Sequence, residues 1–173
     1  MKDILNTIVS RRSVKKFKPD MIDEELVEKV IKAGTYAPTG KNLQSPIILA
    51  VTSKEIRDEL SRLTAEYRGI SNDPFYGAPV ALVVLADKTV PTYIYDGSCV
   101  MENMLLEAHS LGLGACWIHH AKFVFETDYA KDLLKELGLG ENYEGIGTCV
   151  LGIPEIIPEK SIPRKQNYVY YLK

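Results

Sequence analysis

The chain has 173 residues, of which 46% are hydrophobic and 25% are charged, a composition that is ordinary for a folded globular protein. Its formal net charge of -2 argues against a bulk electrostatic attraction to nucleic acid. The longest apolar run, residues 78–86, is too short to cross a membrane, and residues 1–10 lack the apolar core of a signal peptide. We therefore expect residues 1–173 to form a single domain with neither a nucleic-acid nor a membrane partner.

The first half of the chain is predicted to alternate between helices and loops, with one strand. Hydrophobic spacing predicts an amphipathic helix over residues 1–10 and a second helix that begins at the cap Asp23 and stops at Gly34. A polar loop over residues 36–46 leads into a buried strand over residues 47–53. A further helix is predicted over residues 53–67, with Thr52 and Glu55 as its capping box.

The second half begins with an irregular loop and a buried strand over residues 79–88. The helix predicted over residues 93–111 is apolar over most of its girth, so we expect it to be central and buried. A strand over 114–121, a helix from Thr127 to Gly138 and a strand over 145–152 follow. Because strands and helices alternate irregularly, we predict an α+β fold rather than a doubly wound sheet.

The three cysteines, Cys99, Cys116 and Cys149, lie among apolar residues and form no C-x-x-C pair. This usage favours reduced thiols, so we expect a cytoplasmic protein. Cys116, His119 and His120 are close in sequence, but alternate strand positions face opposite sides and a fourth metal ligand is missing. No metal site is therefore predicted, and a Cys116–His120 nucleophile pair stays open as an alternative.

The segment RRSVKKFK, residues 11–18, holds five basic side chains in an otherwise slightly acidic chain. Guanidinium groups bind phosphate oxygens through paired hydrogen bonds, and the hydroxyl of Ser13 adds a further donor. Lys15 lies two residues beyond Ser13, so both can face one ligand if the segment is extended. The alternative is a solvated turn after the first helix.

Two other segments carry groups that suit the same kind of ligand. Arg164 and Lys165 in the tail offer a second pair of cations for a phosphate. Asn42 and Gln44 in the polar loop supply amide donors and acceptors for the imide edge of a heterocycle. Since the chain has neither a dinucleotide-binding fingerprint nor a phosphate loop, these segments together predict a site for a phosphorylated planar cofactor.

The order of these segments resembles the nitroreductase family of flavin mononucleotide (FMN) enzymes. The similarity begins with RRSVKKFKPD and AGTYAPTGKNLQSP and continues with YGAPVALVVLAD, HSLGLGACWIHHAK, VLGIPE and PRKQNYVYYL. It covers essentially the whole chain in the right order. Thr39 stands where the family often has serine, and Ser45 with Pro46 stands where it often has Gln-Pro-Trp. The polar loop therefore has no tryptophan on which a substrate could stack.

The resemblance implies a nitroreductase-like α+β fold, with a central, mainly antiparallel sheet flanked by helices. It also implies a homodimer that exchanges its C-terminal arms and binds two FMN molecules at the subunit interface. The polar loop would reach the FMN of the other subunit, and the segment around Trp117 would lie along the flavin ring. The implied FMN-binding residues are Arg11, Arg12, Ser13, Lys15, Pro38, Thr39, Gly40, Asn42, Gln44, Cys116, Trp117, Ile118, His119, Arg164 and Lys165.

The implied activity is that of an NAD(P)H-dependent FMN oxidoreductase, with ping-pong reduction of nitroaromatic, quinone or related electrophilic acceptors. A cation, Lys15 or alternatively Lys16, would stabilise negative charge at the N1–C2=O edge of the flavin. The flavin carries the hydride chemistry, so no acid or base is required, and His119 is a possible proton donor. The alternatives are a flavin-binding sensor or store without turnover, and a colourless interaction domain.

Overall fold

The computed structural model describes residues 3–173, so the first two residues of the predicted N-terminal helix lie outside the described residues. Within this range, no helix is both long enough and apolar enough to cross a membrane. The elements in chain order are α1 (Ile4–Ser10), α2 (Glu24–Thr35), the short 3-10 helix η1 (Gly40–Asn42), β1 (Pro46–Val51), α3 (Lys54–Arg68), β2 (Val80–Asp87), α4 (Tyr93–Ser110), β3 (Gly114–Ile118), α5 (Ala121–Val124), α6 (Asp128–Glu136) and β4 (Tyr143–Gly152).

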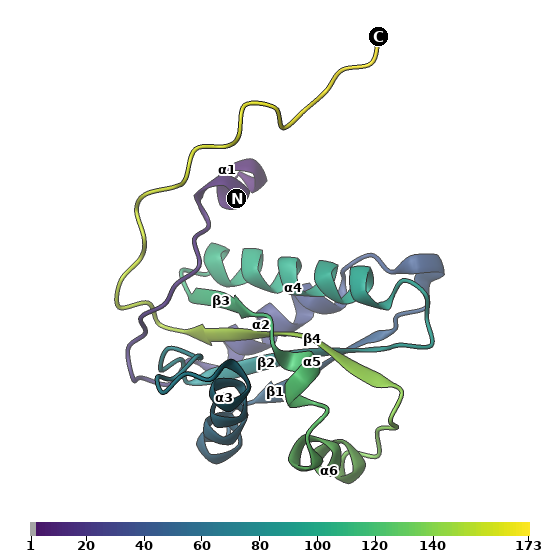
Figure 1. The fold of residues 1–173 in the computed structure, drawn as a ribbon. Helices are drawn as coiled ribbons and strands as arrows, with labels where there is room; N and C mark the ends of the chain where they lie inside the picture. Colours follow the sequence, from purple (N-terminus) through teal and green to yellow (C-terminus); the bar gives the residue numbers. More distant parts are fainter. Residues whose placement is uncertain (1–2) are drawn as a thin grey trace.

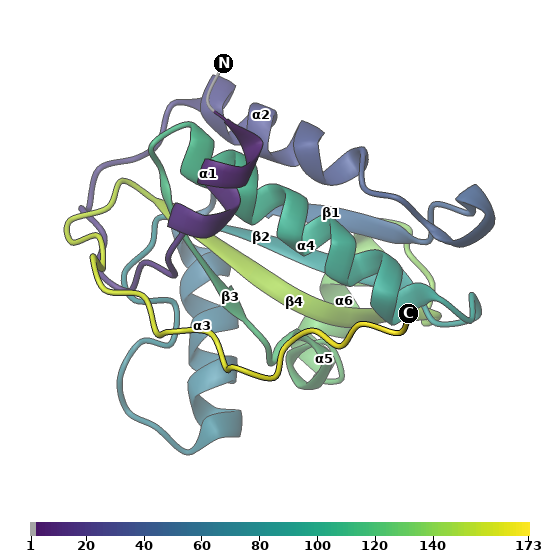
Figure 2. The same ribbon diagram turned by 90° about the horizontal axis from the view of Figure 1, so that it is seen from above.

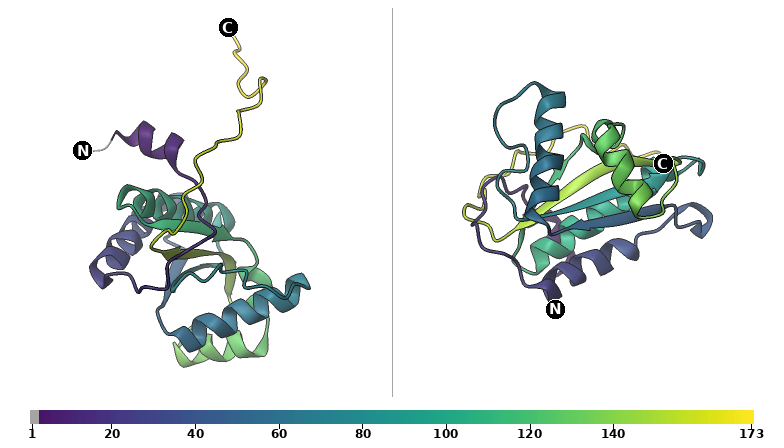
Figure 3. Two further views of the ribbon diagram at one scale, coloured as in Figure 1. Left: turned by 90° about the vertical axis from the view of Figure 1, so that its left-hand side faces the viewer. Right: turned by 90° about the horizontal axis from the view of Figure 1, so that it is seen from below.

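The four strands form one antiparallel sheet in the order β1-β2-β4-β3. Figure 1 shows α2 and α4 over one face of this sheet and α3, α5 and α6 over the other. The right-hand view of Figure 3, from below, also shows α3, α5 and α6 together on that face of the sheet. An antiparallel sheet with helices on both faces confirms the predicted α+β class.

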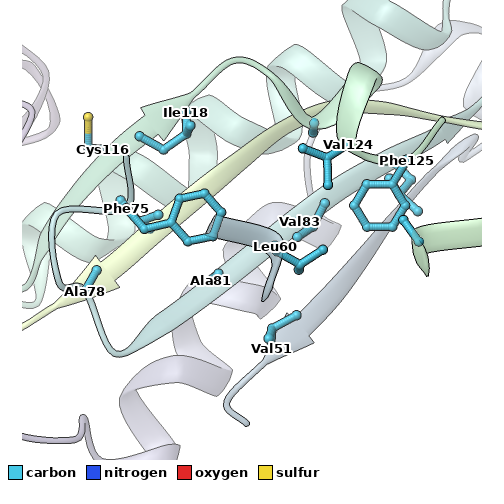
Figure 4. Close-up of a cluster of buried hydrophobic side chains, with 14 of the residues drawn as sticks. Val51, Leu60, Phe75, Ala78, Ala81, Val83, Cys116, Ile118, Val124 and Phe125 are labelled. Carbon is cyan, nitrogen blue, oxygen red and sulfur yellow. The ribbon is translucent and has the colours of Figure 1, made fainter. Parts of the chain in front are cut away.

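The side chains of β2 alternate between two hydrophobic clusters, because successive residues of a strand point to opposite faces. Val80 and Leu82 join the cluster that packs under α2 and α4. Ala81 and Val83 join the cluster under α3 and α5, which Figure 4 shows gathered around Phe75. Both faces of the sheet are covered, which explains why the strand sequences are continuous apolar runs rather than alternating ones.

Gly34 does not stop α2 as the sequence predicts, since the helix continues to Thr35. A Cβ at this position would lie only 2.9 Å from Cγ of Met104 in α4. The glycine therefore allows α2 and α4 to approach closely. The predicted cap of the same helix is confirmed, because the Asp23 carboxylate accepts a hydrogen bond from the backbone N–H of Glu25 at 3.0 Å.

The predicted capping box of α3 is wrong by one residue. Ser53, not Thr52, is the N-cap, and its hydroxyl accepts a hydrogen bond from the N–H of Ile56 at 3.4 Å. Both residues can cap a helix, so the sequence alone does not separate them. The far end of α3 is closed by Gly69, whose φ of 63° places it in the left-handed region that ends many helices.

The boundaries around β3 differ from the prediction. The strand ends at Ile118, so His119 and His120 lie in a turn rather than on opposite faces of a strand. The four-residue helix α5 that follows was not predicted, because one turn is too short to show a hydrophobic period. β4 starts at Tyr143, two residues earlier than expected.

Helix α4 is buried along one side rather than around its girth. Met101 and Met104 are fully buried against the sheet and α2, whereas Ile94 and Tyr95 are 49% and 73% exposed. The prediction of a central, buried helix is therefore confirmed for the side that faces the sheet and α2, and it does not hold around the whole helix. The apolar residues outside the buried side are available to another molecule.

Both ends of the chain leave the body of the protein on the side of α4 (Figures 1 and 3). α1 has the predicted amphipathic sequence but no buried residue, and Ile4 is 76% exposed. Residues 155–173 contain no helix or strand and are exposed throughout. Both terminal segments therefore leave most of their apolar side chains exposed within the described chain.

Candidate flavin site

The basic segment lies in an extended conformation against the edge of the sheet. The N–H of Val14 donates to the carbonyl of Ala115 in β3 at 3.0 Å, and the N–H of Lys18 donates to the carbonyl of Ile153 at 2.9 Å. Val14 is buried, whereas Ser13 and Lys15 on either side of it are exposed. The backbone therefore turns Ser13 and Lys15 to the same outer side, next to β3.

The first two residues of this segment, Arg11 and Arg12, each carry a buried guanidinium nitrogen. Nη1 of Arg12 donates to the carbonyls of Val9 and Arg11, at 2.9 and 2.7 Å. Nη1 of Arg11 and Nε of Arg12 are buried and have no hydrogen-bond partner among the described residues. They border a cavity of about 180 Å³ between the end of α4, β3 and Ile157. Buried donors without partners are unfavourable, so these nitrogens fit an anion that accepts from them.

The structure distinguishes the two candidate lysines. Nζ of Lys16 lies 2.9 Å from a carboxylate oxygen of Glu155, so its charge is already paired. Nζ of Lys15 has no carboxylate partner in residues 3–173 and lies 5.8 Å from the centre of the Tyr76 ring. Lys15 is therefore the cation left for a ligand on this face.

Cys116 lies beside the same segment, on the β3 face that points toward α3. Burial raises the pKa of its thiol, although a hydrogen bond with Ser13 and the charges of Lys15 and Arg11 oppose the rise. The thiol is thus protonated near neutral pH and is a poor nucleophile. His120 lies against Tyr67, with ring centres 5.7 Å apart, so the geometry gives no support to a Cys116–His120 pair.

The other residues predicted to lie along the flavin ring do not point to one side of β3. Ile118 shares the buried face of Cys116, whereas Trp117 packs on the opposite face, toward α4. The indole fits against Gly147, where an added Cβ would lie 2.3 Å from its Nε1. His119 is exposed in the turn after β3. Burial lowers the pKa of its neighbour His120, and the charges of Arg68 and His119 lower it further. His120 is therefore neutral at pH 7.

The polar loop has an unusual backbone. Lys41, Asn42 and Gln44 all have positive φ, between 49° and 55°, and none of them is glycine. Such strained conformations persist where the surroundings hold them in place, and they concentrate at functional sites. The positive φ values are a backbone feature, so they support a binding role for this loop independently of the amide side chains of Asn42 and Gln44.

A buried carboxylate, Asp96 in the first turn of α4, holds the polar loop in this conformation. Its two oxygens accept hydrogen bonds from the N–H of Gly40 at 3.0 Å and from the hydroxyls of Ser45 at 3.1 Å and Thr92 at 2.9 Å. Asp96 was not predicted, and its only signal in the sequence is an acidic residue at the start of an apolar helix. The loop is thus anchored to the N-terminal end of α4.

The predicted site residues do not all meet within one chain. The polar loop lies at the N-terminal end of α4, whereas the cavity bordered by Arg11 includes His109 at its C-terminal end. His109 follows Asp96 by thirteen positions on the same helix, a separation of roughly 20 Å. Figure 2 shows α1 at one end of α4 and the polar loop near the other. Arg164 and Lys165 are exposed in the tail, where Lys165 lies over the ring of Tyr168.

The described residues give no metal site, since no three histidine, cysteine or acidic side chains in that part of the chain are grouped to hold an ion. The arrangement instead places unpartnered cationic donors and a free ammonium together along the edge of the sheet. This combination suits a phosphate joined to a planar, hydrogen-bonding ring.

Comparison with known proteins agrees with this geometry. A family model described as the nitroreductase family matches residues 8–67 and 62–153. A relative from Archaeoglobus fulgidus, named provisionally as an NADH dehydrogenase/NAD(P)H nitroreductase, is 30% identical over 161 residues, which cover 90% of this chain and 87% of the relative. The NADPH-flavin oxidoreductase of Vibrio harveyi is 31% identical over 170 residues, which cover 92% of this chain and 69% of that protein.

A solved structure has the same fold over the full length of both chains. The nitroreductase with bound FMN from Desulfitobacterium hafniense superposes with a TM-score of 0.87 at 26% sequence identity, covering 100% of each chain. The match of the family model, the long alignment at 30% identity and the shared fold lead to one assignment. The chain belongs to the nitroreductase family.

Proposed function

We propose that the chain is an FMN-dependent oxidoreductase that takes electrons from NAD(P)H and reduces nitroaromatic, quinone or related electrophilic acceptors. The names of the relatives from A. fulgidus and V. harveyi support the NAD(P)H-dependent reaction. The FMN bound in the D. hafniense structure supports the choice of cofactor. The observation in this chain that carries the proposal is the pair of buried, unpartnered guanidinium nitrogens of Arg11 and Arg12.

The phosphate of FMN would accept hydrogen bonds from these two nitrogens. The exposed Ser13 hydroxyl and the ammonium of Lys15 continue the line of donors along the sheet edge. Bound FMN would supply the hydride chemistry, for which protein side chains have no equivalent. Lys15 would hold a positive charge at the edge of the ring where reduction places negative charge.

The ends of β3 and of the polar loop would provide the rest of the binding surface. Backbone groups near His119, at the exposed end of β3, are available to orient one edge of the ring. Asn42 and Gln44 are exposed, and the amide of Gln44 donates to Asn42 at 3.4 Å, so both can turn toward a ligand. A side-chain acid is not needed, and His119 is the nearest candidate to donate a proton to an acceptor.

A homodimer would bring the two halves of this site together. Within one chain the polar loop lies at the opposite end of α4 from Arg11, so one flavin cannot contact both. A second copy placed antiparallel along α4 would bring its own polar loop to the first copy's basic segment. We therefore propose that residues 1–173 form one FMN-binding unit whose site is complete only as a dimer.

The apolar surface of the chain supports the dimer. Exposed large hydrophobic side chains concentrate in α1, in the first turn of α4 and in the tail. Figure 1 shows these three segments on the same side of the sheet as α4. Apolar surface that its own chain leaves exposed can mark an interaction site. These side chains are Ile4, Leu5, Ile8, Val9, Ile94, Tyr95, Ile162, Tyr168, Val169, Tyr170, Tyr171 and Leu172.

The tail would then be exchanged between subunits, placing Arg164 and Lys165 near the partner's phosphate or their own. Ser13 bridges Ala115 near the start of the edge strand β3, and the rest of that edge can accept another extended segment. Cys99, Cys116 and Cys149 are free thiols, which supports the expected cytoplasmic location.

The first test is the visible spectrum of the purified protein, recorded before and after anaerobic addition of NADH and then NADPH. We expect bound-flavin bands that bleach with one or both donors and return with a quinone or nitroaromatic acceptor. Flavin bands that persist would support a flavin-binding protein without turnover. A colourless protein that ignores added FMN would contradict the proposal.

The dimer is tested by a variant that ends at Pro158 and therefore lacks the tail. Light scattering should give the full-length protein a mass of twice 19.4 kDa. The shortened variant should keep its circular dichroism spectrum, because residues 155–173 are exposed and contain no helix or strand. We expect its dimer dissociation constant to rise at least about tenfold, since burial of apolar tail residues would be lost.

The matched control keeps the tail and replaces Arg164 and Lys165 by alanine. This variant should retain the dimer mass and lose only FMN affinity. A full-length, FMN-loaded protein with the monomer mass of 19.4 kDa would contradict the composite site.

A further inference from the structure

Tyr76 has the least expected backbone conformation in the loop that leads into β2. Its φ is 56°, in the left-handed region, and it is followed by Gly77 with φ of 74°. For a bulky side chain this conformation is a true outlier, so the surroundings must enforce it. The sequence predicts an irregular loop here, Tyr76 opens the stretch YGAPVALVVLAD that carries part of the family resemblance, and nothing in the proposed function so far uses this strain.

The carboxylate of Asp73 enforces the conformation. It accepts hydrogen bonds from the N–H groups of Phe75 at 2.8 Å and Gly77 at 2.7 Å, on both sides of Tyr76. It is itself held by the hydroxyl of Ser61 and by the buried guanidinium of Arg57 in α3. The N–H of Tyr76 donates to the carbonyl of Asp73 at 3.1 Å. The turn is thus fixed to α3 at several points.

The fixed turn brings the Tyr76 ring to Lys15. Nζ of Lys15 lies 5.8 Å from the ring centre, within the distance at which an ammonium is attracted to an aromatic face. The charge of the same ammonium lowers the pKa of the Cys116 thiol, against the larger effect of burial, so Lys15 is near β3 as well as near the turn. Lysine has a long, flexible side chain, and the ring contact favours those of its conformations that keep the ammonium near Tyr76.

We propose that Tyr76 is a positioning residue that holds the ammonium of Lys15 at the flavin edge of the site. The consequence for the flavin rests on the proposed function, whereas the contact itself exists in the protein without FMN. The positive φ of Tyr76 directs its ring toward Nζ of Lys15, which gives the strained backbone a function. The residue acts through Lys15 and touches neither the acceptor nor the reacting atoms.

The contact is tested first in the FMN-free protein. Reductive methylation with ¹³C labels each lysine while keeping its positive charge. The methyl signal of Lys15, assigned by its loss in Lys15→Arg, should be shifted upfield from the other lysines by the ring current of Tyr76. The shift should remain in Tyr76→Phe and disappear in Tyr76→Leu. A wild-type Lys15 signal at the position of exposed lysines would overturn the inference without any variant.

The matched control is Tyr129→Leu, which removes another half-buried tyrosine packed on the same cluster. It should leave the Lys15 signal in place. A loss of the signal shift in this variant as well would mean that loosened packing, and not the Tyr76 ring, moves Lys15.

The consequence is tested by the midpoint potential and affinity of bound FMN. Tyr76→Leu should lower the midpoint potential of bound FMN. It should also raise the FMN dissociation constant about two- to fivefold, which corresponds to the energy of one exposed cation–aromatic contact. Tyr76→Phe should match the wild type. In a Lys15→Met background, Tyr76→Leu should change neither quantity further. Equal changes in both backgrounds would overturn the positioning role. A wild-type protein that binds no FMN would refute the proposed function, and the contact between Tyr76 and Lys15 would then be tested by the methyl signals alone.

Discussion

Replacing Arg11 and Arg12 together by alanine is expected to weaken FMN binding at least about 100-fold. Nη1 of Arg11 and Nε of Arg12 are buried without a partner among the described residues, so the phosphate would be their acceptor. A hydrogen bond to a charged group contributes roughly 1.5–3 kcal/mol, and two such bonds are lost in the double variant. Titration of the FMN-free protein with FMN, followed by flavin fluorescence, measures the change directly.

A matched control removes two other charges from the same cluster. Lys16 is paired with Glu155 and Lys18 is exposed, so Lys16→Ala with Lys18→Ala changes the net charge equally but removes no predicted phosphate contact. We expect this variant to bind FMN within a few-fold of the wild type. Equal losses in the two double variants would mean that general charge, and not the guanidinium geometry, holds the phosphate.

The single variant Arg11→Met separates binding from folding. An unpartnered buried donor destabilises the FMN-free protein, so its replacement by an apolar side chain of similar length should leave the melting temperature unchanged or raise it. The same change should weaken FMN binding about tenfold or more. A fall in the melting temperature of the FMN-free protein would show that Arg11 has a structural partner and would refute its assignment to the phosphate.

Local patterns in the sequence were enough to predict most of the fold. The apolar runs around Val83 and Val150 form buried strands as predicted, and Asp23 is the predicted cap of α2. Thr127, the predicted start of a helix, is the N-cap of α6. These signals depend on neighbours within a few residues. The errors occur where the decisive contact is distant, as at Gly34, whose reason is the close approach of Met104 in another helix.

The same distinction applies to the candidate site. The basic segment could be predicted from composition, but the choice of Lys15 over Lys16 needed the position of Glu155 at the other end of the chain. Similarly, the role of Asp96 needed its contact with Gly40, 56 residues away in sequence. Ligand-binding chemistry is local in the sequence, whereas the groups that hold it in place come from tertiary structure.

Two carboxylates share one structural task in this protein. The non-glycine residues with positive φ in the described part of the chain are Lys41, Asn42, Gln44 and Tyr76. The first three lie in the polar loop held by Asp96, and Tyr76 lies in the turn held by Asp73. Both strained segments border the predicted halves of the FMN site. The hydrogen bonds of Asp96 and Asp73 thus stabilise backbone conformations that are unfavourable for these residues on their own.

Asp73→Ala is therefore expected to destabilise the folded protein by roughly 3 kcal/mol, because Arg57 and Ser61 lose a partly buried acceptor and the turn loses two backbone bonds. Urea unfolding of the FMN-free protein measures this free energy. Asp58→Ala is the matched control. It removes another carboxylate from Arg57, bound at 2.9 Å but half-exposed, and should cost less than about 1 kcal/mol. Equal effects of the two variants would contradict a special role for Asp73.

The pH dependence gives an independent check on Asp73. Burial alone would raise the pKa of its carboxyl group, but the hydrogen bonds from Ser61, Arg57 and the two backbone N–H groups hold the pKa below its ordinary value of 3.8. The folded state therefore binds the proton less readily than the unfolded state. The stabilisation is complete above the unfolded-state pKa and is lost as the pH falls toward the folded-state pKa. The stability difference between the wild type and Asp73→Asn should accordingly be constant from pH 7 to about 5 and shrink below about pH 4. A difference that stays constant down to pH 2 would mean that the ionised carboxylate does not hold the turn, and that the strain at Tyr76 has another origin.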